Sequence, residues 1–405
     1  MKPMPPIPFA APFADPAGSP IRELFPYLSR PGMISLAGGY PSASLFDQAG
    51  LQEASLRAIA KPGQSLQYSA TEGLPALREA LQQLSAARGV HCASDELIVT
   101  TGSQQAFDLL VRVLIEPGDA VYVESPTYPA TLQALKLAQA HIVQVPADAQ
   151  GLQVDALESL LAETPSARRP KLLYTVPNFS NPGGTLLPAA RREALVQLAL
   201  RYGFLIVEDD PYGALDFGDG TPATLFETAR ALAPGRNPVL YLSSLSKTVA
   251  PALRIGWMVA PPEVLRRCAI AKQTADLCTS SLAQAIAAEY LAGGSADAAI
   301  AAMRAEYGLR MRHMVGALRE RLGARVAFVE PAGGMFVWLR TAPAIDPQRL
   351  FEAAVEAGVL FVPGRAFFAA EADPHCMRLT YAAPDVAQIS EGVARLAQAF
   401  DRAGR

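Results

Sequence analysis

The chain has 405 residues, 50% hydrophobic and 18% charged, which is enough to bury a large core and to form two domains. Its formal net charge of −3 excludes a bulk electrostatic attraction to nucleic acid or to an anionic membrane. The Pro-rich N-terminus lacks the apolar core of a signal peptide, and no apolar run approaches the roughly 20 residues that span a bilayer. Scattered cysteines and histidines predict reduced thiols, no metal site and a cytoplasmic protein.

The first part of the chain predicts an α/β fold. Residues 1–20 are expected to form a flexible arm, because the prolines spread along them disfavour a helix. From about residue 45 to 290, helical patterns alternate with short apolar runs, which predicts a mostly parallel sheet covered by helices on both faces. The predicted strands are Leu97–Thr100, Ala120–Val123, Lys171–Thr175, Phe204–Val207 and Val239–Leu242, and the predicted helices include Gly102–Ile115, Tyr128–Ala138 and Pro188–Tyr202.

The last part of the chain predicts a smaller α+β domain. An Ala-rich pattern over residues 283–322 indicates two helices, the second long and with its charges exposed, at Arg304, Glu306, Arg310 and Arg312. Strands are expected at 326–329, 334–339 and 377–381, and helices near 347–357 and 384–401. We therefore divide the chain into an arm (1–20), a segment that packs with the small domain and the active site (21–45), a large domain (46–300) and a small domain (301–405).

The most informative segment, residues 243–257, reads SSLSKTVAPALRIGW and follows the apolar run Val239–Leu242. Lys247 stands beyond this predicted buried strand, where burial and nearby cations would lower the pKa of its amine and free it as a nucleophile. Ser244, Ser246 and Arg254 would supply phosphate donors. This combination suits pyridoxal 5′-phosphate (PLP), which carries an aldehyde and a phosphate. Taken alone, the segment is equally compatible with a surface lysine in a serine-rich turn.

Polar groups also follow the other predicted strands at their carboxyl ends, where open α/β sheets bind ligands. Gly102-Ser103-Gln104 opens a helix and offers backbone N–H groups to an anion. Tyr128 offers a ring for stacking, and the Asn-Pro-Gly-Gly turn that begins at Asn181 presents an amide. Asp209 or Asp210 offers a carboxylate to a pyridinium nitrogen. Each motif alone has an ordinary explanation as a helix cap, a core tyrosine or a turn, but their joint occurrence indicates one site.

These motifs, in this order and spacing, resemble the class I/II aminotransferase family of fold-type I PLP enzymes. The resemblance covers residues 20–400 and is carried by TGSQQA, SPTYP, PNFSNPGG, VEDDPYG, SSLSKTVAPALRIGW, PAGGMFVWL, VPGRAFF and MRLTYAAP. Within the family the chain looks most similar to the 2-aminoadipate, kynurenine and aromatic amino acid aminotransferases. The resemblance implies a large domain with a mostly parallel sheet of the seven-stranded type and a smaller α+β domain.

The resemblance also implies residue roles. Lys247 would bond to the cofactor aldehyde and carry the substrate Cα proton, Asp209 would pair with the pyridine nitrogen, and Tyr212 would complete the catalytic set. Tyr212 and Asn181 would donate to the phenolic oxygen, and Tyr128 would stack on the ring. The implied phosphate ligands are Ser103, Gln104, Ser244, Ser246, Arg254 and, from the neighbouring subunit of a homodimer with shared active sites, Tyr68.

For the substrate, the resemblance implies that Arg378 binds the α-carboxylate, with Gly39 and Asn181 close by. Arg22 matches a mobile helix that supplies an arginine to acidic side chains in the aminoadipate-type enzymes. A solvent-facing Arg22, paired with Glu23 or a helix end, fits the sequence equally well. Tyr40 would narrow the side-chain pocket.

Three functions compete at this point. The first is an aminotransferase that passes an α-amino group to 2-oxoglutarate or pyruvate by a ping-pong mechanism. The second is another PLP reaction on the same scaffold, β-elimination or decarboxylation, which would use the same Lys247 and Asp209. The third is the effector-binding domain of a transcription regulator, which the chain also resembles. A regulator would need a basic winged helix-turn-helix before the enzyme-like part, where this sequence has only the Pro-rich arm.

Overall fold

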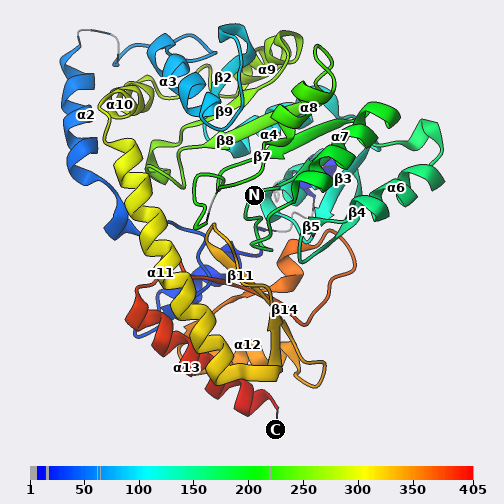
Figure 1. The fold of residues 1–405 in the computed structure, drawn as a ribbon, viewed down its shortest axis with the longest axis vertical. Coiled ribbons are helices and arrows are strands. Elements are labelled where there is room, and N and C mark those ends of the chain that lie inside the picture. The colour runs from blue at the N-terminus through cyan, green and yellow to red at the C-terminus, as the bar shows by residue number, and fades with distance from the viewer. Residues whose placement is uncertain (1–6, 15–17, 62, 64, 219, 405) are drawn as a thin grey trace, which may run out of the picture.

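The computed structural model describes residues 7–14, 18–61, 63, 65–218 and 220–404. It contains a large domain around a central sheet and a smaller domain with its own sheet (Figure 1). The long helix α11 (Ala296–Leu322) runs from one domain to the other. Among the described residues, no helix combines the length and the apolar character needed to cross a bilayer.

The central sheet has the strand order β2-β9-β8-β7-β6-β3-β4-β5. Strands β8, β7, β6, β3 and β4 run parallel to one another, whereas β9 is antiparallel to both of its neighbours. The two-residue strand β5 adds an antiparallel edge to the predicted seven-stranded type of sheet. The bounds are β2 Leu97–Thr100, β3 Ala120–Ser125, β4 His141–Asp148, β5 Gly151–Leu152, β6 Leu172–Thr175, β7 Leu205–Asp209, β8 Val239–Ser244 and β9 Gly256–Val259.

Both faces of this sheet are buried because its central strands are largely apolar. Neighbouring residues of β7 point to opposite faces, so Val207 joins one hydrophobic cluster and Ile206 the other. The first face is covered by α4 (Ser103–Leu114), α5 (Pro129–Leu137) and α9 (Pro262–Ala275). The second is covered by α3 (Pro75–Ala86), α6 (Val154–Glu163), α7 (Ala189–Tyr202), α8 (Leu225–Leu232) and α10 (Ser281–Ala292).

The smaller domain is built on an antiparallel sheet of order β10-β11-β14-β13. Its strands are Val326–Phe328 (β10), Phe336–Thr341 (β11), Val362–Pro363 (β13) and Cys376–Thr380 (β14). The helices α11, α12 (Pro347–Glu356) and α13 (Val386–Ala403) pack together beside it. Strand β1 (Ile34–Ser35) pairs with β12 (Val359–Leu360), so the N-terminal segment lies on this domain. The remaining helices are α1 (Phe25–Leu28) and α2 (Gln48–Ala60).

The structure confirms the predicted fold class and differs from the sequence analysis in several details, among them two strands that were not predicted, β4 and β9. Arg310 is buried rather than exposed, because its guanidinium is satisfied by Glu306 Oε1 and by the backbone oxygen of Ala382, each at 2.7 Å. A short 3-10 helix, Ala11–Phe13, forms in the Pro-rich arm, since a proline is tolerated in a first turn. Residues 1–6 and 15–17 of that arm lie outside the described residues. The division at residue 300 stays a prediction, and α11 runs through it.

Candidate active site

The amine of Lys247 lies at the carboxyl ends of the parallel strands. Strand β8 ends at Ser244, and the following turn places Lys247 beside the end of its neighbour β7. Its Nζ donates to the backbone oxygen of Gly39 over 2.9 Å. Burial lowers the pKa of Lys247 to about 8, and the charges of Arg378 and Arg254 act in the same direction. A substantial fraction of the amine is therefore neutral near pH 8 and can act as a nucleophile.

Asp209, the last residue of β7, is a buried carboxylate with one unused oxygen. Its Oδ2 accepts a hydrogen bond from the Tyr174 hydroxyl at 2.7 Å. Its Oδ1 is buried and has no hydrogen-bond partner within the described chain. Burial raises the pKa of Asp209 to about 6, partly offset by the bond from Tyr174. Because a buried acceptor without a donor is costly, this oxygen is suited to a protonated ring nitrogen.

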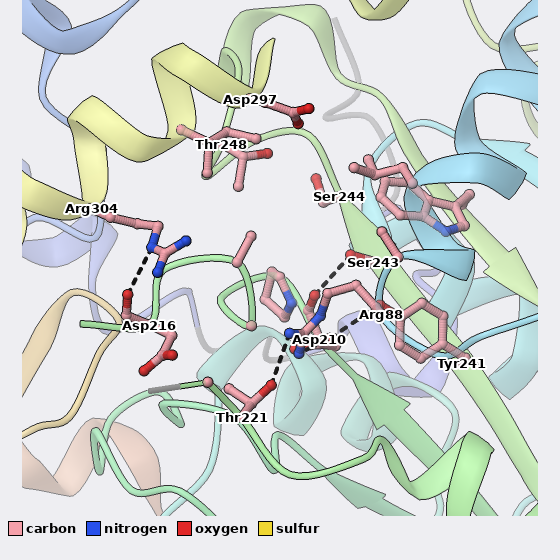
Figure 2. Close-up of a pocket in the computed structure, with 18 of the residues that line it drawn as sticks. Arg88, Asp210, Asp216, Thr221, Tyr241, Ser243, Ser244, Thr248, Asp297 and Arg304 are labelled. Carbon is pink, nitrogen blue, oxygen red and sulfur yellow. Dashed lines mark hydrogen bonds and ion pairs between the residues drawn. The ribbon is translucent and has the colours of Figure 1, made fainter. Parts of the chain in front are cut away.

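The adjacent Asp210 points the other way, and both of its carboxylate oxygens are satisfied. They accept from Asn178 Nδ2 at 2.8 Å, from the Tyr241 hydroxyl at 3.1 Å and from Arg88 Nη2 at 3.2 Å. Figure 2 shows Asp210, Tyr241 and Arg88 among the residues that line a cavity between α3, the end of β8 and the start of α11, whose volume is about 570 Å³. Neighbouring residues of an extended chain face opposite sides, which separates the two aspartates.

Arg378, on β14 of the smaller domain, brings a guanidinium into the same site. Its side chain is 1% exposed and lies over the rings of Phe336 and Phe367, at 4.3 and 5.1 Å. Nη1 donates to Asn181 Oδ1 and Nη2 to the backbone oxygen of Ala37, each at 2.7 Å. Burial lowers the pKa of Arg378 to about 10, so it remains a cation at neutral pH. A buried, oriented guanidinium of this kind is suited to a carboxylate.

Of the other predicted site residues near Lys247 and Arg378, Asn181 and Tyr212 are buried and Tyr128 is partly buried. Asn181 Nδ2 lies 3.4 Å from the Tyr212 hydroxyl, and burial raises the pKa of Tyr212 above its usual value. Tyr128 caps the N-terminus of α5, and burial raises the pKa of its hydroxyl as well. Gly39 faces the site from the N-terminal segment: a Cβ there would lie 3.5 Å from Phe336 and 3.7 Å from Arg378 Nη2.

A positively charged turn at the start of α4 forms a cradle for an anion. Gly102 caps this helix with φ of +80°, a conformation that favours glycine. Arg254 lies directly over it, since a Cβ on Gly102 would be 2.6 Å from Arg254 Nη2. Arg254 Nη1 approaches Ser246 Oγ at 3.4 Å, and the Ser246 N–H donates to Ser244 Oγ at 3.1 Å. The first helical positions belong to Ser103 and Gln104.

This cradle lies directly against the sheet. A Cβ on Gly256, the first residue of β9, would lie 2.4 Å from the carbonyl carbon of Gly102. Glycine at position 256 is therefore required for the turn to lie this close to the strand.

Five predicted site residues are exposed, two of them, Gln104 and Arg254, at the anion cradle. Of the others, Tyr68 is 76% exposed, Tyr40 is 51% exposed, and Arg22 is exposed at the start of a short 3-10 helix, Arg22–Leu24. The chain alone does not bring Tyr68 or Arg22 into the buried group, whereas Tyr40 adjoins Gly39 in sequence.

Three contributors to the site were missed by sequence reasoning, namely Tyr174, Phe336 and Phe367. All three are fully buried and lie in apolar runs, where tyrosine and phenylalanine are indistinguishable from ordinary core residues. The only signal for Tyr174 was its place near the end of a strand next to the one that ends at Asp209.

A lowered lysine pKa, an unsatisfied buried carboxylate and an anion cradle at one sheet edge define a fold-type I PLP-dependent enzyme. The family described as aminotransferase class I and II matches residues 32–396, and the chain belongs to this family. It is 40% identical to the aromatic-amino-acid aminotransferase 1 of Thermococcus litoralis over 94% of this chain and 91% of the relative. It is 39% identical to the 2-aminoadipate transaminase of Thermus thermophilus, over 94% of both chains.

A solved structure supports the same assignment. The alpha-aminoadipate aminotransferase of Thermus thermophilus, in complex with N-(5′-phosphopyridoxyl)-L-leucine, is 38% identical and aligns with a TM-score of 0.88 over 97% of each chain. The chain is thus a PLP-dependent aminotransferase, which confirms the predicted family, fold class and cofactor. The residues present fit PLP: Asp209 Oδ1 lacks a donor in the described chain, and a buried amine and an anion cradle lie at the same sheet edge.

Proposed function

We propose that Lys247 and Asp209 are the central catalytic residues of a ping-pong transfer from an amino acid to a 2-oxo acid, with 2-oxoglutarate as the expected acceptor. Two features found together carry this proposal. The pKa of the Lys247 amine is lowered, and the buried Oδ1 of Asp209 has no hydrogen-bond donor among the described residues. PLP, when bound, supplies an aldehyde carbon and an electron-accepting ring.

Each of the two residues has a specific task. Lys247 would hold PLP through its amine and would move the proton at the substrate Cα. Asp209 holds a proton on the ring nitrogen, and the Tyr174 hydroxyl orients its carboxylate at 2.7 Å. Asn181 and Tyr212 donate to the phenolic oxygen, and Tyr128 stacks on the ring. The proposed phosphate ligands are Ser103, Gln104, Ser244, Ser246 and Arg254.

Arg378 is proposed to bind the substrate α-carboxylate, with Gly39 leaving room beside it. The family relatives include enzymes named for aromatic amino acids and for 2-aminoadipate. We infer that the substrates of this chain have long side chains, aromatic or acidic, which extend past Tyr40 towards Arg22. A distal carboxylate would meet Arg22, whereas an aromatic side chain would contact Tyr40.

A half-reaction screen tests this function. The PLP-loaded enzyme is mixed with one amino acid at a time, and the cofactor absorbance is followed as it converts from the aldehyde form to the amine form. We expect conversion with aromatic amino acids, 2-aminoadipate and glutamate, and return of the aldehyde form on addition of 2-oxoglutarate. Release of ammonia with a 2-oxo acid, or of carbon dioxide, would instead indicate β-elimination or decarboxylation.

We also propose a cytoplasmic homodimer in which Tyr68 contributes to the partner's phosphate site. Tyr68 and the nearby Leu66 are 76% and 75% exposed, a large apolar area for one loop. Subunit mixing tests this: Tyr68→Phe and Arg254→Ala enzymes are each purified and then combined. One site of each hybrid dimer carries neither substitution, so activity should rise above that of both parents. Proven hybrids without such a rise would contradict the shared site.

A further inference from the structure

An ion pair between a buried lysine and a partly exposed aspartate, whose side chain is 28% exposed, lies behind the anion cradle and has no role in the function proposed so far. Lys272, on α9, is 0% exposed. Its Nζ contacts Asp276 Oδ1 at 2.7 Å, Asp276 Oδ2 at 2.9 Å and Gln105 Oε1 at 3.2 Å. Burial by itself raises the pKa of Asp276, but the hydrogen bonds from Lys272 and Gln105 outweigh it and hold that pKa below its usual value. Burial lowers the pKa of Lys272, and its hydrogen bonds to Asp276 oppose that shift.

The pair is connected to a single residue of the cradle, Thr101. The Thr101 hydroxyl donates to Asp276 Oδ2 at 3.0 Å, and the Thr101 N–H donates to Gln105 Oε1 at 2.8 Å. Gln105 Nε2 also donates to Asp276 Oδ2 at 2.7 Å, which closes the network. On its other side, the carbonyl of Thr101 accepts from Arg254 Nη2 at 3.3 Å. The N–H, hydroxyl and carbonyl of Thr101 are thus all fixed, immediately before Gly102.

Fold stability alone does not account for this arrangement. An ion pair of this kind contributes little net stability, because desolvation of the buried lysine opposes its attraction to the partly exposed aspartate. Here its hydrogen bonds meet at the residue that sets the direction of the turn. Backbone donors bind an anion well only when they are held in place before it arrives.

We propose that Lys272 and Asp276 are positioning residues for the cofactor phosphate, which hold Thr101 so that the N–H groups after Gly102 face the anion. This inference rests on the proposed phosphate cradle. Lys272 and Asp276 are therefore expected to affect how tightly the cofactor binds, whereas Lys247 and Asp209 perform the chemical step.

The test measures ligand affinity of the apoenzyme rather than activity. Asp276→Asn and the milder Thr101→Val are prepared without cofactor, and the dissociation constants of PLP and of inorganic phosphate are measured by titration. We expect both constants to rise about tenfold for Asp276→Asn and severalfold for Thr101→Val. Borohydride reduction should still label Lys247. If Asp276→Asn does not fold, Thr101→Val decides the matter.

The chain offers a matched control in Glu306 and Arg310. This pair has the same i,i+4 spacing on a helix, the same 2.7 Å separation and nearly the same burial, but it lies on α11. Glu306→Gln should lower the melting temperature without changing either dissociation constant. Unchanged constants in both Asp276→Asn and Thr101→Val, with stability lost as in Glu306→Gln, would overturn the inference.

The variant Arg254→Ala shows whether the phosphate site itself is wrongly assigned or only the positioning role of Lys272 and Asp276. If Arg254→Ala weakens phosphate binding and the Asp276 and Thr101 variants do not, the cradle stands and the positioning role is wrong. If Arg254→Ala also leaves phosphate binding unchanged, the cradle itself is misplaced.

Discussion

Asp209 and Asp210 are neighbours in the chain, yet their carboxylates differ in how completely they are satisfied. The Asp210 carboxylate has three donors, including Arg88 Nη2, although the Nε of Arg88 has no partner in the described chain. Around Asp209, one carboxylate oxygen and the Nε of Arg378 have no partner in the described chain, and the Lys247 amine donates to the backbone oxygen of Gly39. The first region resembles a structural core, whereas the second is prepared for groups that the chain does not supply.

This contrast indicates which polar residues hold the fold and which perform chemistry. Unsatisfied buried groups cost stability, so they persist where a ligand completes them. Substitutions on the Asp209 side should therefore affect activity, and substitutions on the Asp210 side should affect stability.

The largest effect is expected from Lys247→Ala, which should abolish turnover and leave the circular dichroism spectrum unchanged. Another buried lysine, Lys272, is already paired with Asp276 and does not replace the lost amine. Borohydride reduction of the native enzyme followed by peptide mapping should place the label on Lys247. A label on Lys272 would show that the wrong lysine has been assigned.

The two aspartates should separate activity from stability. Asp209→Asn removes the proposed partner of the ring nitrogen. It should raise the activation free energy by roughly 3–4 kcal/mol, which lowers kcat about 10²–10³-fold. Asp210→Asn leaves Arg88 without its ionised partner, so it should lower the free energy of unfolding by roughly 1–3 kcal/mol with a much smaller effect on kcat. Steady-state kinetics and urea unfolding of both variants provide the comparison. Equal losses of kcat would mean that the two carboxylates do not differ in function.

Arg378→Lys should weaken the binding of every amino acid substrate by roughly 1–3 kcal/mol and so raise each KM. The reason is that lysine cannot bind a carboxylate in the same bidentate manner. Its two aromatic neighbours would also lose their guanidinium contact. Half-reaction kinetics with glutamate, leucine and phenylalanine test this. A loss confined to one substrate would contradict an α-carboxylate role.

Arg22→Ala should have a smaller and selective effect, because this side chain lies outside the buried group. If Arg22 meets a distal carboxylate, 2-aminoadipate and glutamate should each lose roughly 1–3 kcal/mol while leucine and phenylalanine hardly change. The half-reaction of 2-oxoglutarate would be weakened as well, so each half-reaction is measured separately. A small uniform loss across all donors would assign Arg22 to the surface only.

The smallest effect concerns the stability of the apoenzyme. The pKa of Asp209 is raised from 3.8 to about 6 on folding, so the folded chain retains a proton that the unfolded chain releases between these values. The stability from this group is complete below pH 3.8 and is lost as the pH rises through about 6. Asp209→Asn should therefore raise the melting temperature of the apoenzyme at pH 8 by a few degrees and leave it unchanged near pH 4. A destabilised variant at pH 8 would contradict the unsatisfied state of Asp209.

Much of the fold could be predicted from the sequence, because the strands are short apolar runs bounded by turn residues. The predicted strand ending at Val207 continues to Asp209, and that extension places both aspartates at the sheet edge. Strands β4 and β9 were not predicted, because β4 mixes apolar with polar residues and is mostly not buried, and β9 is only four residues long. The exposure of Arg310 was mispredicted because its partners come partly from another segment, at Ala382.

For the site, sequence motifs predicted residues whose identity is chemically unusual, such as Lys247 at the end of a buried strand. They did not predict residues that act through contacts distant in sequence. Tyr174 lies 35 positions before Asp209, and Asp276 lies 175 positions after Thr101. The sequence around Tyr174 and around Asp276 does not indicate the distant residue that each one contacts.

The contact between Gly256 and Gly102 bears on how this binding site could be moved to another protein. Most phosphate-binding loops can be treated as portable segments, but here the loop rests on bare backbone of β9 with no room for a methyl group. A designer who grafts residues 100–105 onto a new scaffold would also need a strand with glycine at the crossing point and the arginine that follows the catalytic turn. The transferable unit is therefore a loop together with one strand of its sheet.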